Sequence, residues 1–332
     1  MLDTLISTRS IKTIALVGIS KNSGKTTLLN GILKHAPQIK WAVMSTGLDG
    51  ETSDRLYKTP KPRVFMPQGA LYCADSSSLD HLGSRVRILS SELYSGRKLW
   101  ILQAEEDLET EITGPSNVSD QICMAKELLA LGATKVLIDG SLDRKSIAFE
   151  DSVHAIILCV GASFGTKEEV SHELKRMNLM INIPQSYFTP YRYKKLMESG
   201  SIAWCRNRTW QRSEITSLIG HEKQFRDLMA LDPEAVYIPT AYTSLLHARL
   251  FPFLKGKERN LIFRHPQCIS LSYRELIEFR RDCRVSCLIP FRVKLYALNP
   301  WSVARSPEDA TEFRYYIRKM HIEKTFIDIM EL

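Results

Sequence analysis

The sequence predicts an α/β protein in which a doubly wound, mostly parallel β-sheet is followed by a second α/β region. Short apolar runs of strand-forming residues alternate with segments of helical periodicity in the first half of the chain. A glycine-bearing turn also joins the first apolar run to a helix. Because strands covered by helices on both faces are apolar throughout, we expect these runs to pair in parallel. The runs lie at 13–17, 39–44, 99–103, 135–139 and 155–160.

The first apolar run continues into the sequence TIALVGISKNSGKTT, which spans residues 13–27. The usual phosphate-binding loop reads Gly, four residues, then Gly-Lys-Ser/Thr, between a strand and a helix. Here five residues separate Gly18 from Gly24, so the loop is one residue longer than usual. Leucines and isoleucines follow at helical spacing in residues 28–33. We therefore expect a sheet of the P-loop NTPase type; the alternative is a chance Gly-Lys-Thr at an ordinary strand–helix junction.

Such a loop would bind the phosphates of a nucleotide, because its backbone N–H groups and the positive helix end attract anions. Lys25 would reach the β- and γ-phosphates, and the Thr26 hydroxyl would ligate Mg²⁺. The expected cofactors are ATP or GTP together with Mg²⁺. The Asn-Lys-x-Asp sequence that reads guanine is absent from GASFGTKEE, which leaves the base open. The predicted nucleotide-binding residues are Gly18, Lys21, Asn22, Ser23, Gly24, Lys25, Thr26 and Thr27.

Acidic residues follow two of the predicted strands, where phosphoryl-transfer sites carry metal-binding or water-orienting groups. Asp139 ends the apolar run Lys135-Val-Leu-Ile, and Asp49 and Glu51 stand in GLDGE just after the second strand. We expect Thr26, Asp139, Asp49 and Glu51 to supply metal ligands. Lys25, Asp49 and Asp139 are the predicted catalytic residues. The alternative interpretations are a strand that ends in a plain turn and an exposed acidic turn.

The second half of the chain also alternates strands and helices, and a single boundary is expected near INIPQSYFTP. This gives a nucleotide-binding domain at 1–183 and a basic α/β partner-docking region at 184–332. Residues 1–165 contain 18 Lys and Arg against 18 Asp and Glu, whereas the remainder contains 27 against 19. The excess of +8 therefore belongs to the second half. Its basic residues are dispersed among acidic ones without a long run, which favours a solvated basic face or the docking of an acidic protein over binding of nucleic acid. Strands are expected at 234–239, 260–264, 285–289, 293–298 and 325–329, and helices at 242–250, 272–281 and 307–320.

Composition indicates a cytoplasmic protein. Seven cysteines are scattered without a framework, as is typical of a reducing compartment. No stretch approaches the roughly 20 apolar residues of a membrane span. The N-terminal residues show no export signal. We therefore expect a cytoplasmic location without membrane association.

Several segments together resemble one family: IALVGISKNSGKTTLLN, GLDGE, KPRVFMPQGAL, LGATKVLIDGSLDRKS, EAVYIPTAYT and YALNPWS. The chain is similar to the nucleotide-binding subunit of the reactivase system of lysine 5,6-aminomutase, an adenosylcobalamin enzyme. It departs from the family pattern at Leu48 and Ser141, where the family carries Arg and Ala. More distantly, the first half resembles the dethiobiotin synthetase and molybdopterin-guanine-dinucleotide accessory group of P-loop proteins.

The resemblance implies an NTP-driven reactivating chaperone, or conformational switch, for a cobalamin-dependent aminomutase. Its expected partners are the aminomutase and a second ATPase subunit. Hydrolysis by the isolated chain is expected to be slow, because no arginine finger can be assigned. One alternative is an ATP-dependent small-molecule kinase or ligase resembling dethiobiotin synthetase. Another is a nucleic-acid-binding module that uses the basic second half, which would lose affinity steeply with salt.

Overall fold

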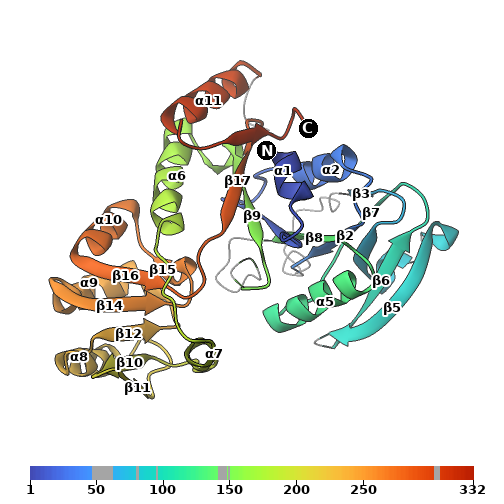
Figure 1. The fold of residues 1–332 in the computed structure, drawn as a ribbon. Helices are drawn as coiled ribbons and strands as arrows, with labels where there is room; N and C mark the ends of the chain where they lie inside the picture. The colour runs from blue at the N-terminus through green and yellow to red at the C-terminus, as the bar shows by residue number, and fades with distance from the viewer. Residues whose placement is uncertain (47–62, 80–81, 95, 141–147, 149, 303–306) are drawn as a thin grey trace. The chain divides into compact units, whose positions relative to one another are not determined.

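The computed structural model describes residues 1–46, 63–79, 82–94, 96–140, 148, 150–302 and 307–332. The protein is a mixed α/β protein with a large, mostly parallel sheet, as the sequence predicts. It divides into two compact units (Figure 1). Unit 1 comprises Met1–Val170 and Arg292–Leu332, and unit 2 comprises Ser171–Phe291. None of the described helices is long and apolar enough to cross a membrane.

Unit 1 is built on a nine-stranded sheet with the order β18-β17-β9-β1-β8-β2-β4-β6-β5. All neighbours from β18 to β4 pair in parallel, whereas β4–β6 and β6–β5 pair antiparallel. A small two-stranded sheet joins β3 and β7. The strands are β1 (Thr13–Gly18), β2 (Trp41–Ser45), β3 (Val64–Met66), β4 (Leu71–Asp75), β5 (Val86–Tyr94), β6 (Arg97–Ala104), β7 (Leu108–Thr110), β8 (Lys135–Gly140), β9 (Ala155–Gly161), β17 (Val293–Asn299) and β18 (Phe326–Asp328).

Helices lie on both faces of this sheet (Figure 1). On one face, Leu28 and Ile32 of α2 belong to a large buried cluster that also contains Leu16 and Trp41. On the other, α5 packs against β8 and β2. The central strands are buried on both faces, which explains their continuous apolar sequences. The helices assigned to this unit or to its boundary are α1 (Leu2–Ser7), α2 (Lys25–His35), α4 (Ser76–Leu79), α5 (Val118–Ala130), α6 (Lys167–Ile181) and α11 (Pro307–Met320).

The expectation that the 99–103 run is parallel to its neighbours is wrong. This run lies in β6, which is antiparallel to β4 and to β5. Strands β3, β4 and β5, which lie between the predicted runs at 39–44 and 99–103, were not expected from the sequence. An apolar run shows that a strand is buried but does not encode its direction, and β6 is covered on both sides by neighbouring strands.

Unit 2 contains a five-stranded sheet with the order β11-β10-β12-β14-β16. Strands β12, β14 and β16 pair in parallel, and β10 pairs antiparallel with both β12 and β11. Ile262 packs with Leu196 of α7, whereas Phe263 contacts Phe279 of α10, so α7 and α10 cover opposite faces. The remaining elements are α7 (Pro190–Glu198), β10 (Ala203–Arg206), β11 (Thr209–Arg212), α8 (Glu222–Ala230), β12 (Ala235–Ile238), β13 (Tyr242–Thr243), α9 (Ser244–Leu254), β14 (Lys257–Phe263), β15 (Ile269–Ser270), α10 (Tyr273–Asp282) and β16 (Cys283–Cys287).

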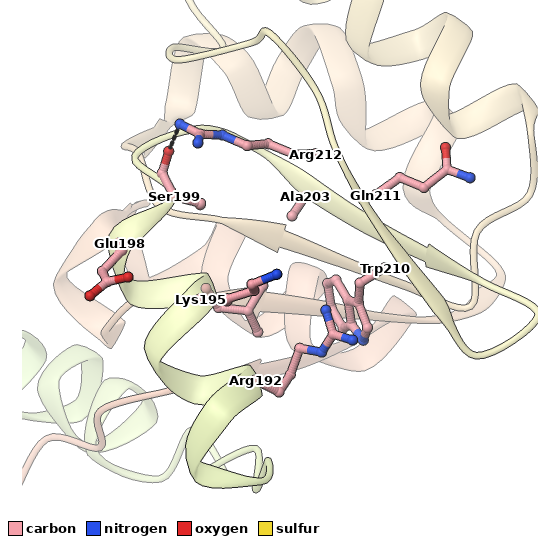
Figure 2. Close-up of a pocket in the computed structure, with 9 residues that line it drawn as sticks. Arg192, Lys195, Glu198, Ser199, Ala203, Trp210, Gln211 and Arg212 are labelled. Carbon is pink, nitrogen blue, oxygen red and sulfur yellow. Dashed lines mark hydrogen bonds between the residues drawn. The ribbon is translucent and has the colours of Figure 1, made fainter.

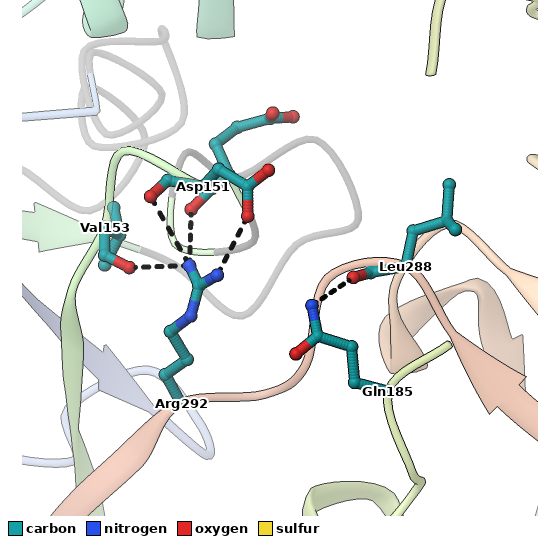
Figure 3. Close-up of polar contacts among 6 residues, drawn as sticks. Asp151, Val153, Gln185, Leu288 and Arg292 are labelled. Atoms are coloured by element: carbon teal, nitrogen blue, oxygen red, sulfur yellow. Dashed lines mark hydrogen bonds and ion pairs between the residues drawn. The ribbon is translucent and has the colours of Figure 1, made fainter. Parts of the chain in front are cut away.

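The chain leaves unit 1 at Val170 and returns to it at Arg292, so unit 1 is discontinuous in sequence. The single boundary expected at 183/184 differs from this division, because β17 inserts beside β9 in the first sheet. Arg292 anchors the returning chain within unit 1: Nη2 donates to Asp151 Oδ1 at 2.8 Å and Nη1 to the Val153 carbonyl at 3.0 Å (Figure 3). Within unit 2, Gln185 Nε2 donates to the Leu288 carbonyl at 2.9 Å.

The division concentrates the positive charge. Residues 171–291 contain 19 Lys and Arg against 11 Asp and Glu, a formal net charge of +8. The whole chain also carries +8, so unit 1 is formally neutral. Anionic partners or ligands that respond to net charge are therefore expected to bind unit 2.

Candidate nucleotide site

Four parallel strands of unit 1 end at the same edge of the sheet. Val17 of β1 lies opposite Gly140 of β8, and Gly18 lies opposite Cys159 of β9. On the far side of β9, Gly161 lies opposite Asn299 of β17. Because β2 and β9 lie on opposite sides of β1, the strand order reverses direction at this point. Ligands of open α/β sheets bind at such a reversal, outside the carboxyl ends of the strands.

The turn between β1 and α2, residues 19–24, lies at this edge and has a tightly defined backbone. Asn22 and Gly24 both have left-handed backbone conformations, with φ of 59° and 92°. The Ile19 N–H donates to the Cys159 carbonyl at 3.0 Å, and the Ser163 hydroxyl donates to the Lys21 carbonyl at 3.2 Å. The end of β9 therefore fixes the turn at Ile19, and the segment after β9 fixes it at Lys21.

Three glycines allow the turn to pack this closely. A Cβ at Gly18 would lie 2.0 Å from Ser23 Oγ, and a Cβ at Gly161 would lie 2.5 Å from Ser23 Cα. A Cβ at Gly24 would meet Ile329 Cδ1 at 2.4 Å and Asn299 Nδ2 at 2.9 Å. These contacts fold the turn back over the end of β1, with walls from β9, β17 and the segment after β18.

Helix α2 begins at Lys25, directly after this turn. Its Gly24 N-cap has no side-chain hydrogen bond, so the first-turn N–H groups receive no capping side chain. Lys25 and Thr26 are half-buried, while Thr27 is exposed. Lys21 and Asn22 are exposed at the tip of the turn. The turn thus presents N–H groups, a helix N-terminus and a lysine, which together attract an anion.

Two hydroxyls lie inside the turn. The buried Oγ atoms of Ser20 and Ser23 have no hydrogen-bond partner within the described residues. Ser23 is itself fully buried, between the glycines that end β1 and β9. A buried hydroxyl without a partner costs free energy, so a ligand oxygen that reached either group would be favoured.

Asp139 stands near the end of β8, between β1 and β2. It lies opposite Leu16 on one side and Ser45 on the other, and its carbonyl accepts from the Thr46 N–H at 3.1 Å. Burial raises the pKa of the Cys159 thiol to about 12; the Lys25 charge lowers that pKa and the Asp139 charge raises it. Because α2 begins at Lys25 directly after the turn that follows β1, Lys25 and Asp139 lie at the same end of the sheet.

The exit of β2 is fixed by the sequence Thr-Gly-Pro before α5. The Ser45 N–H donates to the Thr113 carbonyl at 3.0 Å, and a Cβ at Gly114 would lie 1.8 Å from the Ser45 carbonyl oxygen. Gln121 is fully buried, and its Nε2 donates to the carbonyls of Thr46 at 2.8 Å and Pro115 at 2.9 Å. This network directs the chain out of β2 beside Asp139. The predicted residues Asp49 and Glu51 lie outside the described residues.

The structure thus brings together Gly18, Ser23, Gly24, Lys25, Thr26 and Asp139 at one edge of unit 1. Sequence reasoning did not identify Gly161, Asn299, Ser163 or Gln121, which fix the turn and the exit of β2. A small residue directly after the apolar run 155–160 was the available signal for Gly161, because the carboxyl ends of buried strands border ligand sites.

A magnesium ion fits the donor types at this edge. Thr26 offers a hydroxyl and Asp139 a carboxylate, and Mg²⁺ in nucleotide sites is held by one or two protein oxygens plus phosphates and water. Across the described part of the chain, no group of three or more His, Cys, Asp or Glu could hold a metal ion by itself.

Comparison of the chain with protein-family models, with curated proteins and with solved structures finds no match.

Proposed function

We propose that unit 1 binds a nucleoside triphosphate with Mg²⁺ at the β1–α2 turn and hydrolyses it slowly, as a nucleotide switch of the P-loop type. Lys25 would neutralise phosphate charge, and Thr26 and Asp139 would hold Mg²⁺. In the same proposal, Asp49 would position water or metal. When bound, the metal supplies electrostatic stabilisation of the phosphates.

The observation that carries this proposal is the packing of the turn. A left-handed Gly24 directly before Lys25 turns the chain into α2, and Gly18 and Gly161 let Ser23 lie against the ends of β1 and β9. This arrangement is built at the strand-order reversal, where a ligand is expected. A plain strand–helix junction would not require two glycines at the ends of the turn and a third at the distant position 161.

A glycine replacement tests the proposal without removing any proposed ligand. In Gly161→Ala, the new Cβ would lie 2.5 Å from Ser23 Cα, and the backbone conformation (φ −106°, ψ 140°) tolerates alanine. Overpacking of this kind costs about 1–3 kcal/mol. If the native turn is the binding form, the Kd for Mg–ATP measured by calorimetry should rise about 5- to 150-fold.

Gly165→Ala is the matched control. Its Cβ would meet Glu169 Oε2 at 2.3 Å, so the end of this flexible side chain would have to shift from the Thr166 N–H, which donates to it at 2.7 Å just before α6. This variant should bind Mg–ATP like the unaltered chain. Absence of both ATP and GTP binding by the unaltered chain, or equal affinity in all three proteins, would refute the proposed site.

We further propose that the switch acts on a protein partner, and that the partner is a cobalamin-dependent aminomutase. Formal neutrality of unit 1 and the +8 charge of unit 2 support a division in which unit 1 binds nucleotide and unit 2 docks an acidic protein. The choice of aminomutase rests on the resemblance alone. Mixing the chain, the second ATPase subunit and ATP with inactivated lysine 5,6-aminomutase and fresh adenosylcobalamin should restore turnover. If the aminomutase remains inactive in this mixture, this partner is rejected.

A further inference from the structure

Unit 2 contains a cavity of about 370 Å³ between α7 and the β10–β11 hairpin. Helix α7 contributes Arg192, Lys195, Leu196 and Glu198, and the hairpin contributes Trp210 and Arg212. Figure 2 shows Arg192, Lys195 and Trp210 grouped at one side of the cavity and Arg212 at the other. The volume falls in the range of small-molecule pockets, about 300–1,000 Å³.

The cavity is strongly cationic for its size. Three of its lining side chains are basic, and Glu198 is the one carboxylate among the residues that line it. Glu198 lies 3.8 Å from Lys194, a residue outside the lining, so it is already shared with another cation. The described ion pairs include none that involves Arg192, Lys195 or Arg212. Three cations therefore face one cavity with little local compensation.

Arg212 is held in position by neutral groups. Its Nε donates to the Ser201 hydroxyl at 2.8 Å, and an Nη donates to the Ser199 carbonyl. These bonds fix the guanidinium plane without neutralising its charge. A pre-oriented guanidinium is well suited to bind phosphate oxygens, since its N–H groups match their geometry.

Trp210 supplies an aromatic wall. Its ring is half-buried, and the Arg192 guanidinium carbon lies 5.9 Å from its centroid. Phe188 supports the ring from another side in an edge-to-face contact at 5.8 Å. A supported indole that borders a cavity can stack on a flat ring of a ligand, an interaction worth about 1–3 kcal/mol for nucleic-acid bases.

A second cavity is also bordered by Trp210 and is another place where the anionic end of a ligand could lie. Three of its polar side chains, Ser186, Asn260 and Ser286, bond to one another at 2.6–3.3 Å, and Arg284 is the one cation among the residues that line it. Their hydrogen-bonding capacity is largely used within the protein. The anionic end of a ligand is therefore expected in the first cavity, which is lined by three cations where the second is lined by one.

We propose that this cavity binds a small molecule that joins a flat aromatic ring to a phosphate, such as a nucleoside monophosphate. The phosphate contacts Lys195 and Arg192, the ring stacks on Trp210, and Arg212 on the other side of the cavity attracts the anion through its charge. This site lies wholly within unit 2 and is separate from the proposed nucleotide site of unit 1.

Calorimetric titration of the full chain with AMP, adenosine and inorganic phosphate tests the proposal. Lys195→Ala should weaken the binding of AMP and of phosphate by about tenfold, because one charge-assisted contact is lost. Trp210→Leu should weaken AMP by about tenfold and leave phosphate unchanged. Adenosine should bind more weakly than AMP. Because Lys195 is exposed, its replacement is not expected to affect folding.

Lys194→Ala is the matched control, since Lys194 is the adjacent exposed cation of α7 but does not line the cavity. It should retain AMP affinity, as should Lys25→Ala, which separates this site from the site in unit 1. Equal losses in Lys194→Ala and Lys195→Ala would indicate a diffuse basic surface for a protein and would overturn the proposal. Failure of AMP to bind, or binding that neither Lys195→Ala nor Trp210→Leu alters, would overturn it as well.

Discussion

Replacing Lys25 by alanine is expected to abolish measurable binding of Mg–ATP. In the proposed site, Lys25 contacts both the β- and the γ-phosphate, and each charge-assisted hydrogen bond contributes about 1.5–3 kcal/mol. Loss of two such bonds raises the Kd by roughly 150-fold or more. Calorimetry at matched protein concentration measures the change, and circular dichroism shows whether the variant remains folded.

Lys34→Ala is the control for this experiment. It removes the same charge from the same helix, but at the other end of α2, where Lys34 is exposed and lies 5.4 Å from the Phe65 ring centroid. Its affinity for Mg–ATP should stay within about twofold of the original, because exposed charges a full helix length away are screened by salt. A similar decrease in both variants would mean that Lys25 acts through net charge and makes no phosphate contact.

Acidification is expected to destabilise unit 2 through His265. This imidazole is 5 % exposed, and burial, followed by the Arg264 charge, lowers its pKa from 6.5 to about 3. Below pH 6.5 the unfolded chain binds a proton at this position, while the folded chain does so only near pH 3. Each pH unit in this window therefore lowers the free energy of unfolding by about 1.4 kcal/mol. By about pH 5 the loss is roughly 2 kcal/mol.

Urea unfolding at several pH values, followed by tryptophan fluorescence, measures this effect. His265→Gln should give a smaller decrease in unfolding free energy between about pH 6.5 and 4.5, even if the variant is less stable at neutral pH. Above about pH 7, His265 is neutral in both the folded and the unfolded state, so the unfolding free energies of the two proteins should change with pH in parallel. Burial also lowers the pKa of His154 and His247, so some acid sensitivity should persist in the variant. Identical slopes throughout would contradict the prediction.

Sequence periodicity predicted where buried strands lie better than how they pair. The apolar runs at 13–17, 135–139 and 155–160 fall within β1, β8 and β9. Burial of these strands on both faces leaves a direct signal in the sequence. Strand direction leaves none, which is why β6 was assigned the wrong orientation. The return of residues 293–299 to the first sheet was also missed, because pairing between distant strands is not encoded in local pattern.

For the candidate site, the sequence indicated the segment from Gly18 to Thr27 and Asp139, but not the residues from distant strands that pack against the turn. Lys25 and Thr26 follow a recognisable loop, and Asp139 follows an apolar strand. Gly161 and Asn299 became evident only from the structure, because they act through close contacts with Ser23 and Gly24 that are distant in sequence. The requirement for glycine at 161 is steric, since its backbone conformation suits any residue.

The contact of Gly24 with Asn299 and Ile329 also has a consequence for biosynthesis. At about 5–20 residues per second, the turn leaves the ribosome on the order of 15–55 s before the strand that carries Asn299 is made. Residues 171–291 emerge completely during that delay. Unit 2 can therefore fold while the sheet of unit 1 still lacks β17 and β18. The turn before α2 acquires its last wall only late in translation, so a nascent chain should not yet hold nucleotide in the completed site.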